Sequence, residues 1–113
     1  MVISTLRLFP SREERRHLLA ILRSIQGPTL AQPHCLSCGL YEEDGFDEAV
    51  LYFERWDSEA EFERHVRSES YRRILAAIEC SQKAPEIAFN FVNTSRGMDL
   101  INELRGEKSA TGK

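Results

Sequence analysis

Alternating and apolar runs along the chain predict four strands. Residues 2–9, VISTLRLF, alternate with apolar side chains on both faces, which indicates a strand that is covered on both sides. Residues 34–42 and 48–56 flank a turn, EDGFD at 43–47, and the second of these runs is rich in β-branched and aromatic residues. The fourth strand is expected over residues 86–92, EIAFNFV.

A first helix is predicted between the first two strands. Ser11 and Glu14 have the S-x-x-E spacing of a capping box, which marks a helix start. Gly27 and Pro28 predict the end of the helical pattern, so residues 28–33 are expected to form a loop. Apolar residues recur on one helix face between these limits, namely Leu18, Ile21, Leu22 and Ile25.

A second helix is predicted between the third and fourth strands, opened by Ser58 and Glu61 at the same capping-box spacing. The SES run at 68–70 is expected to bend or loosen this helix. From Gly97 onward, residues 97–105, GMDLINELR, predict a short C-terminal helix. We expect residues 1–106 to form one domain. The polar residues 107–113 are expected to be a disordered tail. The core face of the second helix consists of Phe62, Val66, Ile74, Leu75 and Ile78.

The order of these elements is β-α-β-β-α-β, followed by the short helix. This order is typical of the ferredoxin-like fold, an α+β architecture in which a four-stranded antiparallel sheet carries two helices on one face. The strands are too apolar for the other face of the sheet to remain in water. We therefore expect a second copy to cover it, sheet face against sheet face, in a homodimer.

Composition narrows the class of protein. Acidic and basic residues are mixed throughout the 113-residue chain and leave a formal net charge of −3, which argues against a nucleic-acid partner. No apolar stretch approaches the roughly 20 residues needed to cross a bilayer, and the N-terminal apolar run is too short for a signal peptide, so no membrane partner is expected. Three cysteines form an odd set, which favours free thiols in a reducing, cytoplasmic compartment.

Residues 33–43, PHCLSCGLYEE, contain a C-x-x-C pair that is compatible with a zinc site, a redox pair or a strand with two thiols. If 34–42 is a strand, Cys35 and Cys38 point to opposite faces and can neither bind one metal ion nor form a disulfide. The remaining cysteine, Cys80, lies on the second helix and does not complete a zinc site. We therefore predict packed thiols and no metal.

Residues 54–71, ERWDSEAEFERHVRSESY, resemble a motif of the antibiotic biosynthesis monooxygenase domain, a dimeric α+β barrel. In that family an aromatic-rich strand ends in E-x-W-x-S and continues into a helix with H-x-x-S. Residues 96–105 also look like the C-terminal helix of many members, so the resemblance covers essentially the whole chain. The positions that match the strand and helix motif are Glu54, Trp56, Ser58, Phe62, His65 and Ser68.

This resemblance implies a cofactor-independent monooxygenase that oxidises a small hydroquinone, anthrone or polyphenol with molecular oxygen. Such chemistry needs an apolar pocket for an aromatic molecule, a proton acceptor and donors for the developing oxyanion. An anthrone-oxidising member uses an Asn, a Trp and an Arg, and the Trp matches Trp56. Tyr52 stands at the Asn position, and Arg72 or Arg73 is the loose match to the Arg. Leu75 and His65 stand where the haem-degrading branch has its axial His and a Trp, which disfavours haem degradation.

The candidate catalytic residues are therefore Trp56, His65 and Tyr52, and the candidate substrate-binding residues are Val50, Glu54, Arg72 and Asn90. Because side chains alternate along a strand, the even-numbered residues of 50–56 share one face, which we expect to be the cavity wall. Packing alternatives remain open: Trp56 as an anchor between strand and helix, His65 as a half-buried packing residue, and Glu54 in an ion pair between subunits. Two alternative functions also remain, a non-catalytic aromatic-ligand-binding or stress-response protein and a structural dimerisation domain.

Overall fold

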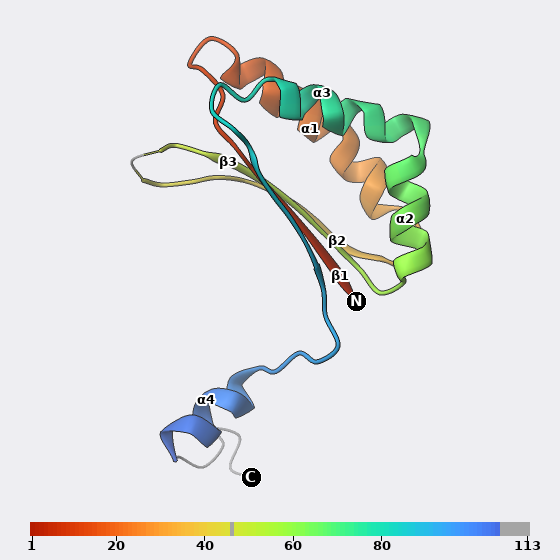
Figure 1. The fold of residues 1–113 in the computed structure, drawn as a ribbon, viewed down its shortest axis with the longest axis vertical. Helices are drawn as coiled ribbons and strands as arrows, with labels where there is room; N and C mark the ends of the chain where they lie inside the picture. The colour runs from red at the N-terminus through yellow and green to blue at the C-terminus, as the bar shows by residue number, and fades with distance from the viewer. Residues whose placement is uncertain (46, 107–113) are drawn as a thin grey trace.

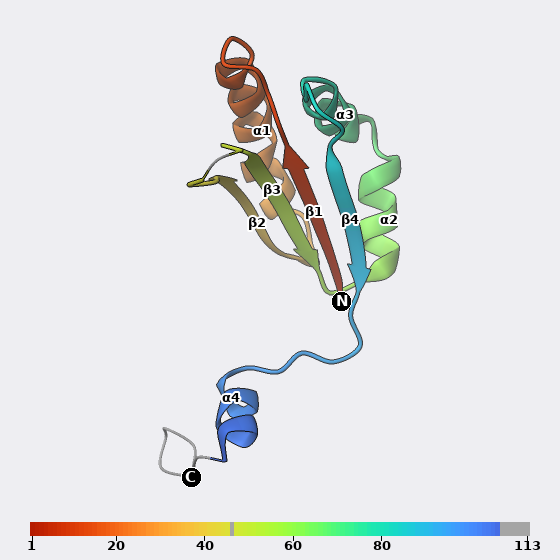
Figure 2. The ribbon, with the colours of Figure 1, turned by 60° about the vertical axis from the view of Figure 1, so that its left-hand side comes forward.

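Four antiparallel strands form one sheet in the order β2-β3-β1-β4 in the computed structural model of the protein, which describes residues 1–45 and 47–106 (Figures 1 and 2). The two central strands are β1 (Val2–Leu8) and β3 (Val50–Trp56), and the two edge strands are β2 (Cys35–Glu42) and β4 (Glu86–Phe91). All four predicted strands are thereby confirmed, with ends that differ by one or two residues.

Helices cover one face of this sheet (Figure 1). They are α1 (Arg15–Leu30), α2 (Glu59–Arg67) and α3 (Arg72–Glu79), with a single 3₁₀ turn, η1 (Glu69–Tyr71), between the last two. The predicted bend at 68–70 is confirmed, because Ser68 is extended and ends α2. The chain therefore has the predicted α+β, ferredoxin-like architecture, with a second helix that is broken in two.

Helix α1 runs three residues beyond its predicted end, so the predicted loop is wrong over 28–30, whereas residues 31–33 lie outside the helix. Pro28 lacks a backbone N–H, but its neighbours keep the last turn helical, since the Ala31 N–H donates to the Gly27 carbonyl at 3.0 Å. Thr29 is buried in this turn, and tertiary packing here outweighs the helix-breaking tendency of the Gly-Pro pair. At the other end, the Ser11 hydroxyl accepts the Glu14 N–H at 3.1 Å, but this bond closes a turn that precedes the helix. The N-cap of α1 is Glu14, which has no side-chain cap, so the predicted helix start at Ser11 is three residues too early.

The two faces of the sheet differ because side chains alternate along each strand. Pairing of Leu6 with Tyr52 and of Ser4 with Glu54 places the even-numbered residues of both central strands on the helix side. There they pack against α1 and α3 in the core. The buried apolar core includes Val2, Leu6, Leu8, Leu18, Leu22, Val50, Tyr52, Trp56 and Ile74.

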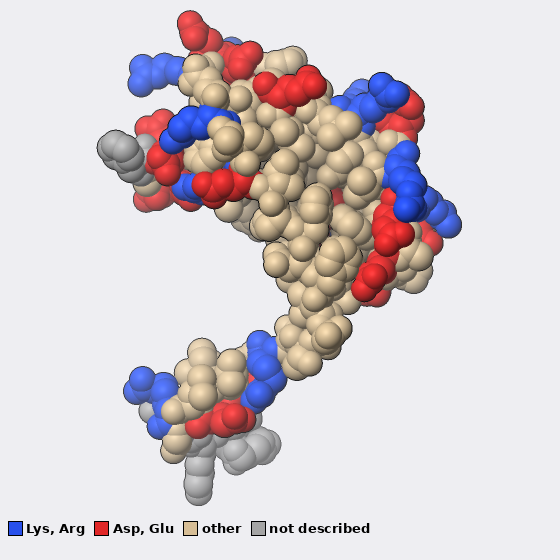
Figure 3. Space-filling view, in the orientation of Figure 1, with Lys and Arg blue, Asp and Glu red and all other residues tan. Residues whose placement is uncertain are grey.

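The outer face of the sheet carries Ile3, Leu51, Phe53 and Tyr41, and no helix within residues 1–45 and 47–106 packs over it (Figure 1). Helix α4 (Met98–Arg105) projects from the end of β4 on an extended linker. Figure 3 shows that this face and α4 border a hollow whose surface is mostly uncharged.

Two sequence expectations lie at the margins of the described chain. The predicted tail at 107–113 lies outside the described residues, as does Phe46 in the predicted turn at 43–47. Across residues 1–45 and 47–106, the helices are all too short or too polar to cross a bilayer.

Candidate functional site

A buried carboxylate lies at the centre of a hydrogen-bond network between β3 and α2. Glu54 is only 1% exposed, and its Oε1 accepts the indole N–H of Trp56 at 2.9 Å. Its Oε2 accepts the hydroxyl of Tyr52 at 2.7 Å and lies 2.9 Å from Nε2 of His65. Three donors therefore converge on one carboxylate, which satisfies both of its oxygens away from water.

The contacts of His65 determine where its proton lies. The side-chain amide of Gln32 lies 3.2 Å from Nδ1 of His65, and an amide NH₂ group can only donate. With the Gln32 amide as the donor, Nδ1 is the acceptor, and Nε2 carries the proton that is donated to Glu54. The ring is 3% exposed and lies between Trp56, at a centroid distance of 4.9 Å, and Tyr71, at 5.3 Å. His65 is thus a neutral imidazole that is oriented by a carboxylate.

Local sequence rules bring these residues together. Strand alternation places Tyr52, Glu54 and Trp56 on the helix side of β3, as predicted. Ser58 then caps α2 immediately after the strand, because its hydroxyl accepts the Glu61 N–H at 3.2 Å. Two turns into this capped helix, His65 faces the sheet directly above Glu54.

Tyr52 acts as a donor within this network. The thiol of Cys38 donates to the Tyr52 oxygen at 3.2 Å, and the Tyr52 hydroxyl in turn donates to Glu54. Burial, followed by the negative charge of Glu54, raises the pKa of Tyr52 far above its ordinary value. Tyr52 therefore stays a neutral phenol and is no candidate for a base.

The two thiols of the C-x-x-C pair do not lie on opposite faces as predicted, because β2 contains a β-bulge. The register of β2 against β3 shifts between Cys35 and Ser37, so Cys35 lies opposite Trp56 while Cys38 lies opposite Glu54. Both thiols consequently point to the helix side, whereas regular alternation predicts opposite faces. Both are free, and burial raises the pKa of each to about 11. The prediction of packed thiols stands, although the reason given for it was wrong.

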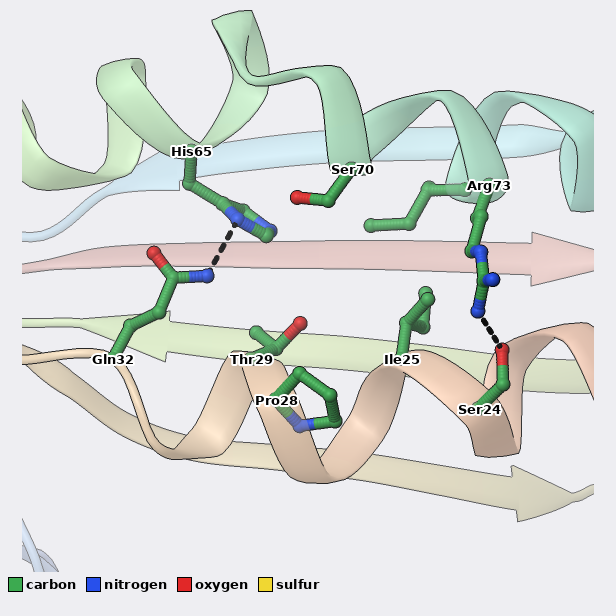
Figure 4. A pocket seen from close by; sticks show the side chains of 9 residues that line it. Ser24, Ile25, Pro28, Thr29, Gln32, His65, Ser70 and Arg73 are labelled. Carbon is green, nitrogen blue, oxygen red and sulfur yellow. Dashed lines mark hydrogen bonds between the residues drawn. The ribbon is translucent and has the colours of Figure 1, made fainter.

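A pocket of about 270 Å³ opens between α1 and the η1–α3 segment (Figure 4). His65 is the member of the buried network that reaches it, and the Gln32 amide bonded to its Nδ1 lies at the same end. The pocket thus ends on the nitrogen of His65 that carries the lone pair. Its lining consists of Ser24, Ile25, Pro28, Thr29, Gln32, His65, Ser70, Arg73 and Ile74.

The other predicted site residues lie outside this pocket. Val50, Tyr52, Glu54 and Trp56 share a face as predicted, but they are packed in the core behind His65. Of the candidate catalytic and substrate-binding residues, His65 alone lines the pocket.

Arg72 and Asn90 lie elsewhere. The Arg72 side chain is exposed and ion-paired with Glu69 at 2.8 Å. Asn90 is opposite Ile3 on the outer face of the sheet. Of the two arginines that loosely match the family position, Arg73 therefore lines the pocket and Arg72 does not.

Sequence reasoning missed Gln32, Thr29 and Ser24, which belong to α1 or directly follow it. The Gly-Pro pair predicts a helix end before Gln32, which therefore falls in the expected loop. The available signal is the four-residue spacing from Ile25 to Thr29, which continues the buried face of α1 past Pro28. For metal ions, the described residues contain no group of three or more His, Cys, Asp or Glu side chains placed to hold one.

The fold and the site define a ferredoxin-like α+β protein with a small pocket that ends on a buried His–Glu pair. A sequence profile of the antibiotic biosynthesis monooxygenase family matches residues 1–77. The match spans more than half of the chain, so the protein belongs to the antibiotic biosynthesis monooxygenase family. No curated protein matches the chain.

Solved structures of distant relatives share this fold. A candidate antibiotic biosynthesis monooxygenase from Deinococcus radiodurans is 22% identical, with a TM-score of 0.75 over 86% of this chain and 97% of that one. Rv0793 from Mycobacterium tuberculosis is 24% identical, with a TM-score of 0.73 over 85% and 98% of the two chains. A conserved protein from Methanosarcina mazei Go1 is 23% identical, with a TM-score of 0.71 over 82% and 94%. At these identities the likeness establishes the fold alone.

Proposed function

We propose that this protein is a cofactor-independent monooxygenase that oxidises a small hydroquinone or related phenol with molecular oxygen. The observation that carries the proposal is the pocket that ends on His65, whose other ring nitrogen is hydrogen-bonded to the buried Glu54. Membership of the antibiotic biosynthesis monooxygenase family supports the same class of chemistry. Anthrones and larger polyphenols are the other substrates that the sequence resemblance implies.

In this proposal His65 is the catalytic residue and general base. A phenolic hydroxyl displaces the Gln32 amide and transfers its proton to Nδ1 of His65. The imidazolium that forms is stabilised by the Glu54 carboxylate, which already accepts the Nε2 proton. Trp56 and Tyr52 act as positioning residues, because they bond to Glu54 and do not line the pocket.

The substrate anion then reacts with oxygen. It gives one electron to O₂, and the resulting phenoxyl radical and superoxide combine at a ring carbon to form a peroxide. Cleavage of the O–O bond leaves one oxygen on the ring as a carbonyl and releases the other as water, which takes up the ring hydrogen and the proton held by His65. For a hydroquinone the products are a hydroxyquinone and one water molecule, so that atoms and electrons balance. In this proposal, Gln32 and Thr29, which line the pocket, donate hydrogen bonds to the developing oxyanion.

The volume of the pocket favours the smaller of the candidate substrates. Sites for drug-sized ligands typically measure about 300–1,000 Å³. At about 270 Å³, this pocket lies just below that range. A single substituted ring therefore suits it better than the three fused rings of an anthrone.

We further propose that the protein is a homodimer in which the outer sheet faces of two copies pack together. Half-exposed apolar residues on this face, including Ile3, Leu51 and Phe53, support this arrangement. The hollow between the outer face and α4 offers space for the second copy (Figure 3). Three free cysteines support a reducing, cytoplasmic location.

One observation favours a second candidate, a non-catalytic protein that binds an aromatic molecule. Nδ1 of His65 is already occupied by the Gln32 amide, so a base is exposed only after that hydrogen bond breaks. A ligand that leaves the bond intact would bind without being oxidised.

Oxygen uptake by metal-free protein distinguishes these functions. The substrates are hydroquinone and its methylated and hydroxylated derivatives, with the rate of uncatalysed autoxidation subtracted. Saturable uptake that falls at least about a hundredfold in His65→Gln supports the monooxygenase. His17→Gln, which changes an exposed histidine on α1, is the matched control and should keep full activity. Uptake at the uncatalysed rate with every compound would reject the proposal in favour of a binding role.

A further inference from the structure

A positively charged side chain, that of Arg73, lies at the end of the pocket opposite His65. Figure 4 shows His65 and Gln32 at one end, and Arg73 with Ser24 at the other. The side chains of Ile25, Pro28 and Ile74 provide an apolar middle section. A molecule in this pocket therefore meets a proton acceptor at one end and a guanidinium group at the other.

No acidic residue of the described chain lines this pocket, and Arg73 is the only lysine or arginine among the lining residues. Several other arginines of the protein are ion-paired with carboxylates. Arg7 is ion-paired with Glu43 at 2.6 Å, and the neighbouring Arg72 is ion-paired with Glu69. For Arg73, by contrast, the residues described here supply no carboxylate within 4.0 Å.

A hydroxyl group holds the Arg73 guanidinium in place. Its Nη1 donates to Oγ of Ser24 at 2.9 Å. Ser24 donates its own proton to the Ile21 carbonyl at 2.6 Å, so its oxygen is oriented to accept from Arg73. A guanidinium has five N–H donors in a planar fork, and this contact uses one of them. The remaining donors suit a planar, two-oxygen anion such as a carboxylate.

We propose that the substrate is a phenolic aromatic acid, and that Arg73 binds its carboxylate while its hydroxyl faces His65. This inference rests on the proposed function for the identity of the reacting end, and on the pocket alone for the acidic end. The apolar middle section suits one aromatic ring, and the two polar ends orient that ring. Arg73 is then the residue that sets specificity for an acid over a neutral hydroquinone.

Anaerobic binding tests this inference without any turnover. We would measure by calorimetry the dissociation constants of 2,5-dihydroxybenzoate and of hydroquinone, which share the same ring and differ by the carboxylate. The wild-type protein should bind the acid at least about tenfold more tightly, as a charge-assisted contact provides. Arg73→Met should abolish this preference and leave the affinity for hydroquinone unchanged. Because the Arg73 contact is at the surface, raising the salt concentration should also weaken binding of the acid alone.

The matched control is Arg72→Met, which removes the adjacent arginine outside the pocket and should leave both dissociation constants unchanged. Arg73→Lys should recover only part of the preference, because an ammonium group lacks the planar fork. Equal affinity of the wild-type protein for the two compounds would overturn the inference, as would an equal loss in the two Met variants.

The two proposals fail in different ways. Oxidation of neutral hydroquinones without any preference for acids would reject the role of Arg73 and leave the monooxygenase intact. If binding of the acid depends on Arg73 but no oxygen is taken up, the carboxylate site is supported and the proposed oxidation is rejected.

Discussion

The Nε2 proton of His65 is directed at the Glu54 carboxylate across 2.9 Å, although the two residues are on different elements and both are buried. A neutral imidazole with this partner has its basic nitrogen facing away from the core, toward the pocket. The pair therefore couples the packed interior of the sheet to a cavity between the helices.

Replacing Glu54 with Gln should destabilise the protein and lower its activity. The NH₂ group of the new glutamine would point at one or more of the donors of Trp56, Tyr52 and His65, and two donors cannot form a hydrogen bond. We expect the free energy of unfolding to fall by about 1–3 kcal/mol. The kcat for hydroquinone oxidation should fall at least about tenfold, because His65 loses the carboxylate that stabilises its protonated form. Affinity for a non-oxidisable phenol should stay unchanged, since Glu54 does not line the pocket. An unchanged kcat in a folded variant would contradict a role for the pair in catalysis.

The thiols of Cys35 and Cys38 should resist alkylation at neutral pH. With pKa values raised to about 11 by burial, each is only about 0.1% thiolate at pH 8. Mass spectrometry after iodoacetamide treatment at pH 8 should find Cys80 modified first, because that thiol is the least buried of the three. Rapid modification of Cys38 in the folded protein would show that the network around Tyr52 opens readily.

The same raised pKa values predict a loss of stability at alkaline pH. The folded pKa lies above the ordinary thiol value of 9.0, so the unfolded chain loses these protons first. The contribution of the two thiols to stability is therefore complete below about pH 9 and is lost as the pH rises toward 11. The melting temperature should fall over this range, and it should fall less steeply in Cys38→Ala. Parallel curves for the two proteins would contradict the raised pKa of Cys38.

Gly39→Ala should lower the free energy of unfolding by about 1–3 kcal/mol, because the added methyl group overpacks the sheet. A Cβ atom at Gly39 would lie 2.4 Å from Cε1 of Phe53 and 2.7 Å from the Tyr41 ring. Gly27→Ala is the matched control, since nothing lies within 4 Å of that position and the residue is inside α1. Urea unfolding should show the control to be as stable as the wild type or more so, by about 0.5–1 kcal/mol.

Ile3→Glu should separate the proposed dimer into folded monomers. Ile3 is on the central strand β1 and faces outward, so a charge there would be buried between the two sheets. Light scattering after size-exclusion chromatography should report half the mass of the wild type. Leu75→Glu, at a 49% exposed apolar residue of α3, is the control and should keep the wild-type mass. A monomeric wild-type protein would remove the basis for a dimer.

Local patterns predicted much of this molecule. Strand alternation placed Tyr52, Glu54 and Trp56 on one face, and the capping box at Ser58 predicted a helix that brings His65 back toward them. Residues 54–71, which resemble the family's motif, also contain Glu54, Trp56 and His65 of the buried network. These features depend on residues close together in the chain, for which period and capping rules are sufficient.

The pocket itself was not predictable from those patterns. It depends on the contact between Gln32 and His65, which are brought together by the packing of α1 against the second, broken helix. The helix end was misplaced because Pro28 is a strong local signal, whereas the burial of Thr29 that outweighs it is a tertiary effect. Similarly, a bulge adds one residue to a strand without a marked change of composition, so strict alternation assigned Cys35 to the wrong face.

The bulge in β2 has a consequence for how the length of this chain can vary. Leu36 is the extra residue, 45% exposed, and the residues on either side of it already alternate correctly against β3. Deleting it would therefore join Cys35 to Ser37 without changing any other pairing in the sheet. Strand β2 can thus lose one residue while Glu54 and His65 keep their register.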